Sequence, residues 1–368
     1  MRDATISICK AIAIILMVAG HSECPKMLSR FLYEFHMPLF FITSGYFFSM
    51  KYLTDEAIFV KKKIKGIYLP FVKWSVVFLL LHNLMFEAGI LNEQYGNISG
   101  GVTHPYTWHQ IEQNFWNIIT FMSGYDEFLA GAFWFFRALL VGSILYLALF
   151  KIVAKIFQRF SKTTPLTQQQ TTSIAITVCM IVLALCAWKT SERLTIHSVA
   201  QGGYRDLMGC FFFGCGHLMR GRIEKVLPEW KLTAVFFIIV MIFALYAPSN
   251  MAWNATFDQF IKLPLPALCG FALTYSISRI INNHDNIVRR FLIFCGNYTL
   301  YILVFNVISF KLVSIIKIAY YDLDWQQIGC HMVIHDYAST DCFWIIYTIA
   351  GVTIPLAFRY IYIKFKSL

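Results

Sequence analysis

Long apolar stretches recur along the whole chain, and they restrict its fold more than any other feature. Runs of about 20 apolar residues are typical of helices that span a bilayer, whereas a transmembrane barrel would show alternating segments of ~10 residues. The sequence is 58% hydrophobic and only 14% charged, against about 25% charged in soluble domains. This excludes a soluble globular enzyme, a disordered chain and a secreted disulfide scaffold. Ten candidate spans lie roughly at 5–22, 31–50, 67–91, 129–150, 172–188, 204–219, 232–248, 262–281, 291–316 and 342–363.

We therefore expect an all-α, polytopic integral membrane bundle of about ten transmembrane helices. No gap between the spans is long enough for a second domain, so residues 1–368 should form a single transmembrane domain without a separate soluble one.

The basic residues indicate an orientation for this bundle. If the N-terminus lies in the cytoplasm, 20 of the 31 Lys and Arg residues fall on the cytoplasmic side and 8 on the outer side. This bias predicts that both termini are cytoplasmic. The net charge of +11 could suggest nucleic acid, but the charges lie in short clusters between apolar runs. Anionic lipid explains such clusters better, so we expect the lipid bilayer and no nucleic acid as a partner.

Polar residues inside the spans are the most informative, because they are costly in lipid and face a protein interior or a wet cavity. Lys10 and His21 are eleven residues apart in the first span, about three helical turns, so both side chains share one face. The alternative is a lysine that reaches to the inner interface and a histidine that caps the helix.

Three further spans carry polar side chains at a depth similar to that of His21. They are His36 in the second span, Arg137 in the fourth and Asn306 in the ninth. We expect these residues to share the outer half of one bundle with His21, with Ser22 and Trp134 beside them. Arg137 then needs a partner anion or a water-filled cavity. Arg205 and Asp206 at the start of the sixth span are typical of an interfacial ion pair.

Two clusters of potential ligands lie outside the spans. Lys61, Lys62, Lys63 and Lys65 could bind phosphates on the cytoplasmic side, or they could simply anchor the topology at lipid head groups. His331 and His335 have a spacing that suits a metal on a helix, but no third ligand accompanies them. We expect no metal site.

Several segments together resemble the membrane-bound acyltransferase family 3, which includes O-acyltransferases of bacterial surface polysaccharides. The resemblance covers nearly the whole chain. Its most specific parts are Lys10 to Ser22, similar to the family's motif of a basic residue, ten residues and a histidine, and Phe35 to Tyr46. Supporting parts are the basic run before Pro70 and the segments 133–139, 213–220 and 296–301.

The resemblance implies a cytoplasmic acyl-CoA donor, with acetyl-CoA the commonest, as co-substrate, and a glycan or lipid-linked sugar acceptor at the outer face. It implies a multi-pass protein of the bacterial inner membrane. His21 matches the family's essential histidine, Lys10 takes the place of its arginine, and Lys62 and Lys65 resemble its cytoplasmic Arg-x-x-Arg motif. Lysines keep the charge but lose the bidentate geometry of arginine. Ser7 and Asn306 stand where many members have Asp and His.

These observations lead to a hypothesis of direct O-acyl transfer. The CoA phosphates bind the inner lysines, the pantetheine arm passes Lys10, and His21 acts as general base on the acceptor hydroxyl. Arg137 or His36 stabilises the oxyanion or orients the substrate. Two alternatives remain open: a polysaccharide or acyl-group transporter that works with a separate transferase, and a membrane scaffold.

Overall fold

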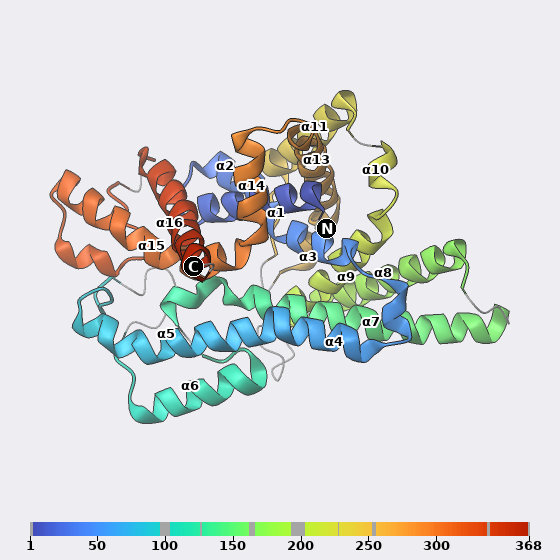
Figure 1. The fold of residues 1–368 in the computed structure, drawn as a ribbon, viewed down its shortest axis with the longest axis horizontal. Coiled ribbons are helices and arrows are strands. Elements are labelled where there is room, and N and C mark those ends of the chain that lie inside the picture. Colours follow the sequence, from blue (N-terminus) through green and yellow to red (C-terminus); the bar gives the residue numbers. More distant parts are fainter. Residues whose placement is uncertain are drawn as a thin grey trace. The chain divides into compact units, whose positions relative to one another are not determined.

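The described part of the chain is helical throughout and contains no strand. The computed structural model describes residues 3–95, 104–125, 127–161, 166–192, 203–226, 228–251, 255–336 and 339–366. Its α-helices are α1 (Ala4–Gly20), α2 (Lys26–Tyr33), α3 (His36–Tyr46), α4 (Glu56–Lys63), α5 (Leu69–Glu87), α6 (Trp108–Phe121), α7 (Trp134–Ser161), α8 (Gln168–Ser191), α9 (Tyr204–Met219), α10 (Ile223–Val226), α11 (Trp230–Tyr246), α12 (Phe257–Lys262), α13 (Pro264–Asn282), α14 (Ile287–Asn297), α15 (Thr299–Tyr321) and α16 (Phe343–Lys366) (Figure 1). The short helices η1 (Met50–Leu53), η4 (Phe128–Phe133) and η6 (Trp325–Gly329) are of the 3-10 type, and η2 (Ile64–Tyr68) is π-helical.

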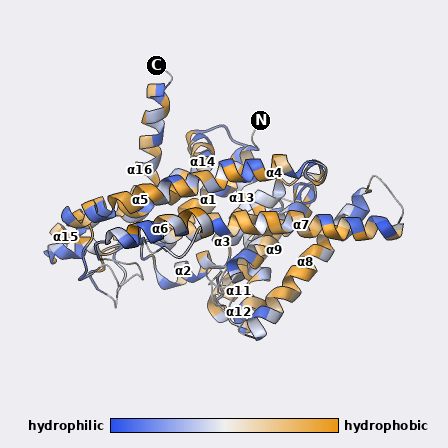
Figure 2. Cartoon of the chain, turned by 90° about the horizontal axis from the view of Figure 1, so that it is seen from below, coloured by the Kyte–Doolittle hydropathy of each residue, from blue (hydrophilic) through white to orange (hydrophobic). Residues whose placement is uncertain are grey.

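Long apolar helices confirm the predicted membrane protein. Six helical stretches are long and apolar enough to cross a bilayer, and α1 and α11 are shorter apolar helices. Figure 2 shows that hydrophobic residues predominate along α7 and α8. The six stretches are Glu56–Glu87, Phe128–Phe160, Gln168–Ser191, Phe257–Asn282, Thr299–Tyr321 and Phe343–Lys366. The chain is therefore a polytopic helical bundle, in which α3 and α9 account for the two remaining predicted runs.

The predicted second span, 31–50, is divided into α2 and α3 at Glu34 and Phe35. The Glu34 side chain is fully buried, and its carboxylate accepts hydrogen bonds from the backbone N–H (2.9 Å) and the hydroxyl (2.6 Å) of Ser249. A Cβ atom on Gly270 would collide with the Phe35 ring. The break is thus fixed by contacts with residues more than 200 positions away, which the local apolar pattern cannot indicate.

Other helix boundaries also differ from the predicted spans, and the ninth span, 291–316, is divided into α14 and α15 at Tyr298. The helix that was expected to begin near residue 67 begins at Glu56 and carries the lysine cluster, passing through η2. Asp55 caps it by accepting a hydrogen bond from the Ile58 N–H (3.0 Å). Residues 108–121, which lie outside the ten predicted spans, form α6, whose first turn is closed by a capping box between Thr107 and Gln110.

The contacts divide the chain into two compact, interleaved units. Unit 1 comprises 1–13, 30–68 and 136–293, and unit 2 comprises 14–29, 69–135 and 294–368. The prediction of one transmembrane domain over 1–368 stays a prediction. All ten cysteines, including Cys330 and Cys342, are free thiols.

Unit 1 is built around the packing of α3 on α9, and glycines permit its close approach. A Cβ atom on Gly45 would collide with the backbone carbonyl of Phe213, and one on Gly216 would collide with that of Ile42. Small residues of this kind allow helix backbones to approach in a membrane.

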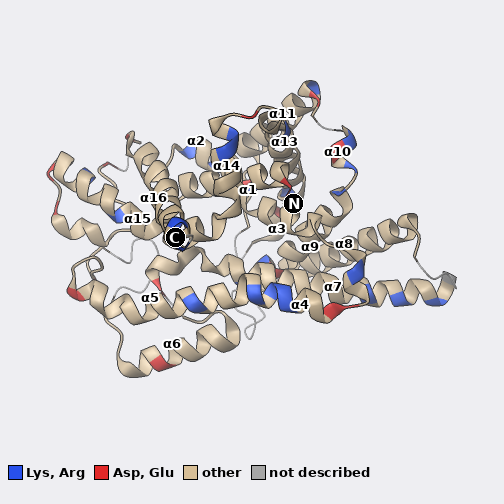
Figure 3. Cartoon of the chain, in the orientation of Figure 1, with Lys and Arg blue, Asp and Glu red and all other residues tan. Residues whose placement is uncertain are grey.

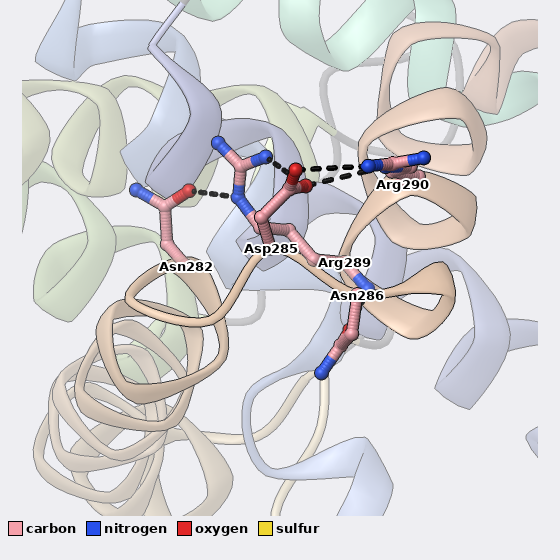
Figure 4. Close-up of polar contacts among 5 residues, drawn as sticks. All are labelled: Asn282, Asp285, Asn286, Arg289 and Arg290. Carbon is pink, nitrogen blue, oxygen red and sulfur yellow. Dashed lines mark hydrogen bonds and ion pairs between the residues drawn. The ribbon is translucent and has the colours of Figure 1, made fainter.

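A compact turn joins α13 and α14 within unit 1 (Figure 4). Asp285 accepts from Arg289 at 3.3 Å and from Arg290 at 2.9 and 3.2 Å. The Asn286 side chain accepts from the backbone N–H of Arg289 at 2.9 Å and so caps the start of α14. The turn is therefore fixed by side chains that are adjacent in sequence.

Unit 2 is built around the pair α15 and α16. A Cβ atom on Gly351 would lie 2.6 Å from Phe310 and 2.7 Å from Val18, so this glycine lets α16 approach both α15 and the end of α1. The segment that joins α15 to α16 folds back onto them: the Lys317 ammonium pairs with Asp341 at 2.7 Å. Unit 2 is thus held together by contacts between distant parts of the sequence.

Candidate functional site

His21 directly follows the last residue of α1. Its backbone N–H donates to the carbonyl oxygens of Met17 and Val18, both at 3.1 Å, and its side chain is partly buried. Helix α1 is continuous from Lys10 to this end, so the two residues lie about three turns apart on one face, as the spacing predicts. The division between the units falls within α1, which places Lys10 in unit 1 and His21 in unit 2.

The neighbouring Ser22 fixes the turn after α1. Its side chain is fully buried, and its hydroxyl donates to the carbonyl of Ala19 at 2.8 Å and lies 2.9 Å from the Thr348 hydroxyl on α16. Glu23 follows in the left-handed backbone region with φ 61°. A buried hydroxyl pair and a tight turn therefore hold the backbone of His21 in place.

His21 has a second histidine, His331, as an aromatic neighbour. The ring centroids of His21 and His331 are 5.8 Å apart, and the rings of Phe128 and Phe310 enclose His331 at 5.9 and 5.8 Å. The buried Nε2 of His331 has no hydrogen-bond partner among the residues that the structure describes. Burial, with the nearby charges of His21 and Lys311, lowers the pKa of His331 to about 3. This imidazole is therefore neutral at ambient pH, and one of its nitrogens is open to a ligand.

Lys311 on α15 holds His331 in this position. Its buried ammonium donates to the backbone carbonyls of Ile328 (2.6 Å) and Cys330 (2.7 Å), directly before the histidine. It also lies 5.3 Å from the centroid of the Phe128 ring. A buried cation on a spanning helix thus fixes the loop that carries a candidate functional residue.

His331 and His335, which share a metal-like spacing, point to different neighbours. The His335 ring stacks on Tyr321 with a centroid distance of 3.8 Å, whereas His331 faces His21. Within the described ranges, no group of three or more His, Cys, Asp or Glu residues could hold a metal ion.

The two other residues predicted to line the site in unit 2 are Asn306 and Trp134. Asn306 is buried on α15, and its amide donates to the carbonyls of Ile302 (3.0 Å) and Leu303 (2.9 Å). Its Oδ1 has no hydrogen-bond partner in the described part of the chain. Trp134 begins α7, with its ring 6.4 Å from that of Phe135. Asn306 thus retains an acceptor oxygen that can receive a hydrogen bond.

Arg137 in unit 1 has the partner anion that an arginine in a span requires. Its guanidinium lies 3.1 Å from the Asp206 carboxylate on α9, and the two side chains are 11% and 6% exposed. Gly142, five residues further along α7, allows this approach, because a Cβ there would lie 2.8 Å from the backbone N of Cys210. Arg205, which the sequence paired with Asp206, donates from Nε to the Met251 carbonyl at 3.1 Å.

His36 opens α3 and is also in unit 1. Its side chain is buried, its Nδ1 donates to the Leu32 carbonyl at 2.7 Å, and its ring meets the edge of Tyr33 at 4.9 Å. The structure thus places His21 and Asn306 in unit 2, and His36 and Arg137 in unit 1. That these four residues share one site stays a prediction.

The lysine cluster lies on a helix (Figure 3), at the junction of α4 with the π-helical η2. Lys61, Lys62 and Lys65 are exposed, whereas Lys63 turns inward and donates to the Ser44 hydroxyl at 3.0 Å. The Lys62 ammonium donates to the Tyr52 hydroxyl at 3.2 Å. π-Helical segments are rare and often occur at functional sites. Lys61, Lys62 and Lys65 are exposed to solvent and, with Lys63 anchored, remain compatible with phosphate binding.

A buried histidine–carboxylate pair went unnoticed in the sequence. His82 on α5 is fully buried, and its Nδ1 lies 2.8 Å from Glu127, while its Nε2 donates to the backbone carbonyl of His104 at 2.9 Å. The ring also stacks on Tyr106 at 3.7 Å. Both ring nitrogens are occupied, so this histidine fastens the segment around His104 to α5 and has no nitrogen left for a substrate.

Comparison with known proteins gives one match. A family model described as an acyltransferase domain matches residues 3–360. No curated protein and no solved structure matches the chain.

Proposed function

This chain belongs to the acyltransferase family 3, and from this premise we propose that it is an O-acyltransferase acting across a membrane. It transfers an acyl group, in the simplest case acetyl, from cytoplasmic acyl-CoA to a hydroxyl of a cell-surface or lipid-linked saccharide at the outer face. The observation that carries the proposal is the pair formed by His21, at the end of α1, and His331, in a membrane protein of an acyl-transferring family.

His21 is the general base in this scheme. It removes the proton of the acceptor hydroxyl as the oxygen attacks the thioester carbonyl. The tetrahedral intermediate then collapses, the C–S bond breaks, and His21 returns the proton to the departing thiolate, which leaves as CoA–SH. No step calls for a metal ion.

His331 supports this role of His21 through its neutrality. A cationic neighbour would disfavour the protonated state that His21 reaches during the reaction, whereas a neutral imidazole lets it form. The open Nε2 of His331 can also hold the acceptor hydroxyl or a water beside His21. Arg137 and His36 are proposed to stabilise the oxyanion or orient the substrate, and Ser22, Trp134 and Asn306 to line the acceptor side.

The acyl-CoA donor is proposed to bind at the cytoplasmic lysines. The exposed ammonium groups of Lys61, Lys62 and Lys65 suit the phosphates of CoA, and Lys63 fixes the helix that presents them. Lys10 lies along the route proposed for the pantetheine arm. The donor is consumed in each turnover and is therefore a co-substrate. We propose the bacterial inner membrane as the location, with both termini in the cytoplasm.

The test is acyl transfer by the purified full-length protein in proteoliposomes. Labelled acetyl-CoA is supplied on the side of the termini, and surface glycan fractions are supplied as acceptor. We expect His21→Ala to lower transfer by about 10²–10⁴-fold. His335→Gln is the matched control, because His335 stacks on Tyr321 away from His21, and it should retain activity. Full activity of His21→Ala would refute the general base.

The same assay separates transfer from transport. A direct acyltransferase produces acylated acceptor without any other protein, whereas an exporter gives product only when a separate transferase is added. Mass spectrometry of the product identifies the acyl group and the modified hydroxyl.

A further inference from the structure

A large cavity in unit 2 plays no part in the scheme above. It has a volume of about 730 Å³ and lies between α15, α16 and the first part of α5. Its walls are almost entirely apolar and include Phe305, Leu312 and Phe358. Three cations line it, Lys73, Lys311 and Arg359, and no acidic residue does. An apolar cavity with only positive charges favours an anionic ligand that also carries a hydrocarbon part.

Arg359 is held in a cage of tyrosines. Its guanidinium carbon lies 4.7 Å from the ring centroid of Tyr301, 5.0 Å from that of Tyr298 and 5.2 Å from that of Tyr362. Its buried Nε has no hydrogen-bond partner among the described residues, and none of their carboxylates pairs with it. A guanidinium stacked on aromatic faces keeps its edge N–H groups available for a phosphate.

Lys73 is the second available cation. Its ammonium lies 4.7 Å from the centroid of the Trp74 ring, and Trp74 packs against Phe305 at 4.7 Å. It forms no ion pair with any residue in the described ranges. Lys311, by contrast, already donates to two backbone carbonyls. The uncompensated positive charge of the cavity therefore comes from Lys73 and Arg359.

We propose that this cavity binds a single-chain lipid phosphate, with the phosphate at Arg359 and Lys73 and the hydrocarbon chain along α15 and α16. The cavity volume matches one ligand-sized molecule. Inorganic phosphate would leave the apolar walls unfilled. The amide-rich pantetheine arm of CoA would find few polar partners on them, and buried amides without hydrogen bonds are costly. A lipid-linked acceptor has this combination of head and chain.

Binding to the purified full-length protein in phosphatidylcholine nanodiscs tests the proposal. The probes are farnesyl phosphate, farnesol, inorganic phosphate, phosphatidic acid and acetyl-CoA. We expect farnesyl phosphate to bind, and Arg359→Gln and Lys73→Gln each to weaken it by roughly tenfold to a hundredfold. Lys364→Gln is the matched control, since it removes a cation from the same helix α16 but not from the cavity wall, and it should bind normally.

Four results would overturn the proposal. These are equal binding of farnesol, equal binding of inorganic phosphate, displacement of farnesyl phosphate by acetyl-CoA, and tighter binding of the two-chain phosphatidic acid. If Arg359→Gln fails to fold, Lys73→Gln carries the test. His21→Ala should bind farnesyl phosphate like the unmodified protein, so loss of acyl transfer and loss of the lipid site are measured separately.

Discussion

The buried ion pair between Arg137 and Asp206 allows structural and catalytic roles of Arg137 to be separated. The two side chains are 11% and 6% exposed, and the shortest distance between them is 3.1 Å. Two unit charges about 4 Å apart attract each other by about 4 kcal/mol at an effective dielectric constant of about 20. Removing one partner of such a pair costs about 3–5 kcal/mol, because the other charge stays buried without compensation.

We therefore expect Arg137→Met to lower the free energy of unfolding by about 3–5 kcal/mol. The double variant Arg137→Met, Asp206→Leu should recover most of this loss, since apolar residues of similar volume replace a buried pair at little cost. Unfolding by SDS in mixed micelles measures both. Asp258→Asn is the control: it breaks the more exposed pair with Lys262, and a change below about 1 kcal/mol is expected.

Activity of the double variant then decides the role. If Arg137 stabilises the oxyanion, transfer stays down by about 10²–10³-fold in a protein whose stability is restored. Recovery of both stability and transfer would show that Arg137 only holds α7 to α9. If Arg137→Met is as stable as the unmodified protein, the loss of Arg137 does not leave Asp206 as an uncompensated buried charge.

Three further predictions concern stability. The pKa of His331 lies at about 3 in the folded protein, whereas the same histidine takes up a proton below about pH 6.5 in the unfolded chain. The free energy of unfolding should therefore fall as the pH drops from about 6.5 towards 3. In thermal melts, His331→Phe should show less of this fall. Gly216→Ala should cost about 1–3 kcal/mol by forcing α3 and α9 apart, whereas Gly66→Ala, with no atom within 4 Å of the added Cβ, should be close to neutral, and the two melting temperatures give the comparison. Hydrogen bonds and charge from Arg290 lower the pKa of Asp285. The stabilisation that the Asp285 carboxylate gives should therefore disappear as the pH falls through that lowered pKa. At neutral pH, Asp285→Asn should have a slightly lower melting temperature than the unmodified protein, and the difference should shrink in high salt.

Local patterns predicted the membrane class and the geometry of α1. Apolar runs report burial in lipid, and the eleven-residue spacing of Lys10 and His21 needs only a continuous helix, which α1 provides. The capping of α6 is present in the sequence as Thr107 and Gln110, three residues apart, but the segment lies outside the predicted apolar spans.

Contacts between distant segments were not predictable in the same way. His331 lies 310 positions from His21, and its place depends on the Lys311 ammonium binding two carbonyls of the preceding loop. The break between α2 and α3 depends on Glu34 meeting Ser249. Neither contact produces a periodic pattern in the sequence, because each one joins a single side chain to a single loop. A single sequence shows that a polar residue in a span needs a partner, but it does not show which one.

Five cations on the spanning helices fall into two groups according to their contacts. Arg137 and Lys317 pair with carboxylates, and Lys311 donates to carbonyls, so each of these positive charges is matched by the protein. Lys73 and Arg359 lie on helices long and apolar enough to span the bilayer, contact aromatic faces, form no ion pair with any described residue and line one cavity. Aromatic rings offset only part of the cost of a cation in an apolar medium. The remaining cost is removed if an anion from outside the protein enters the cavity. A cation that is neutralised or hydrogen-bonded within the chain therefore indicates a structural role, whereas a cation without such a partner indicates a ligand.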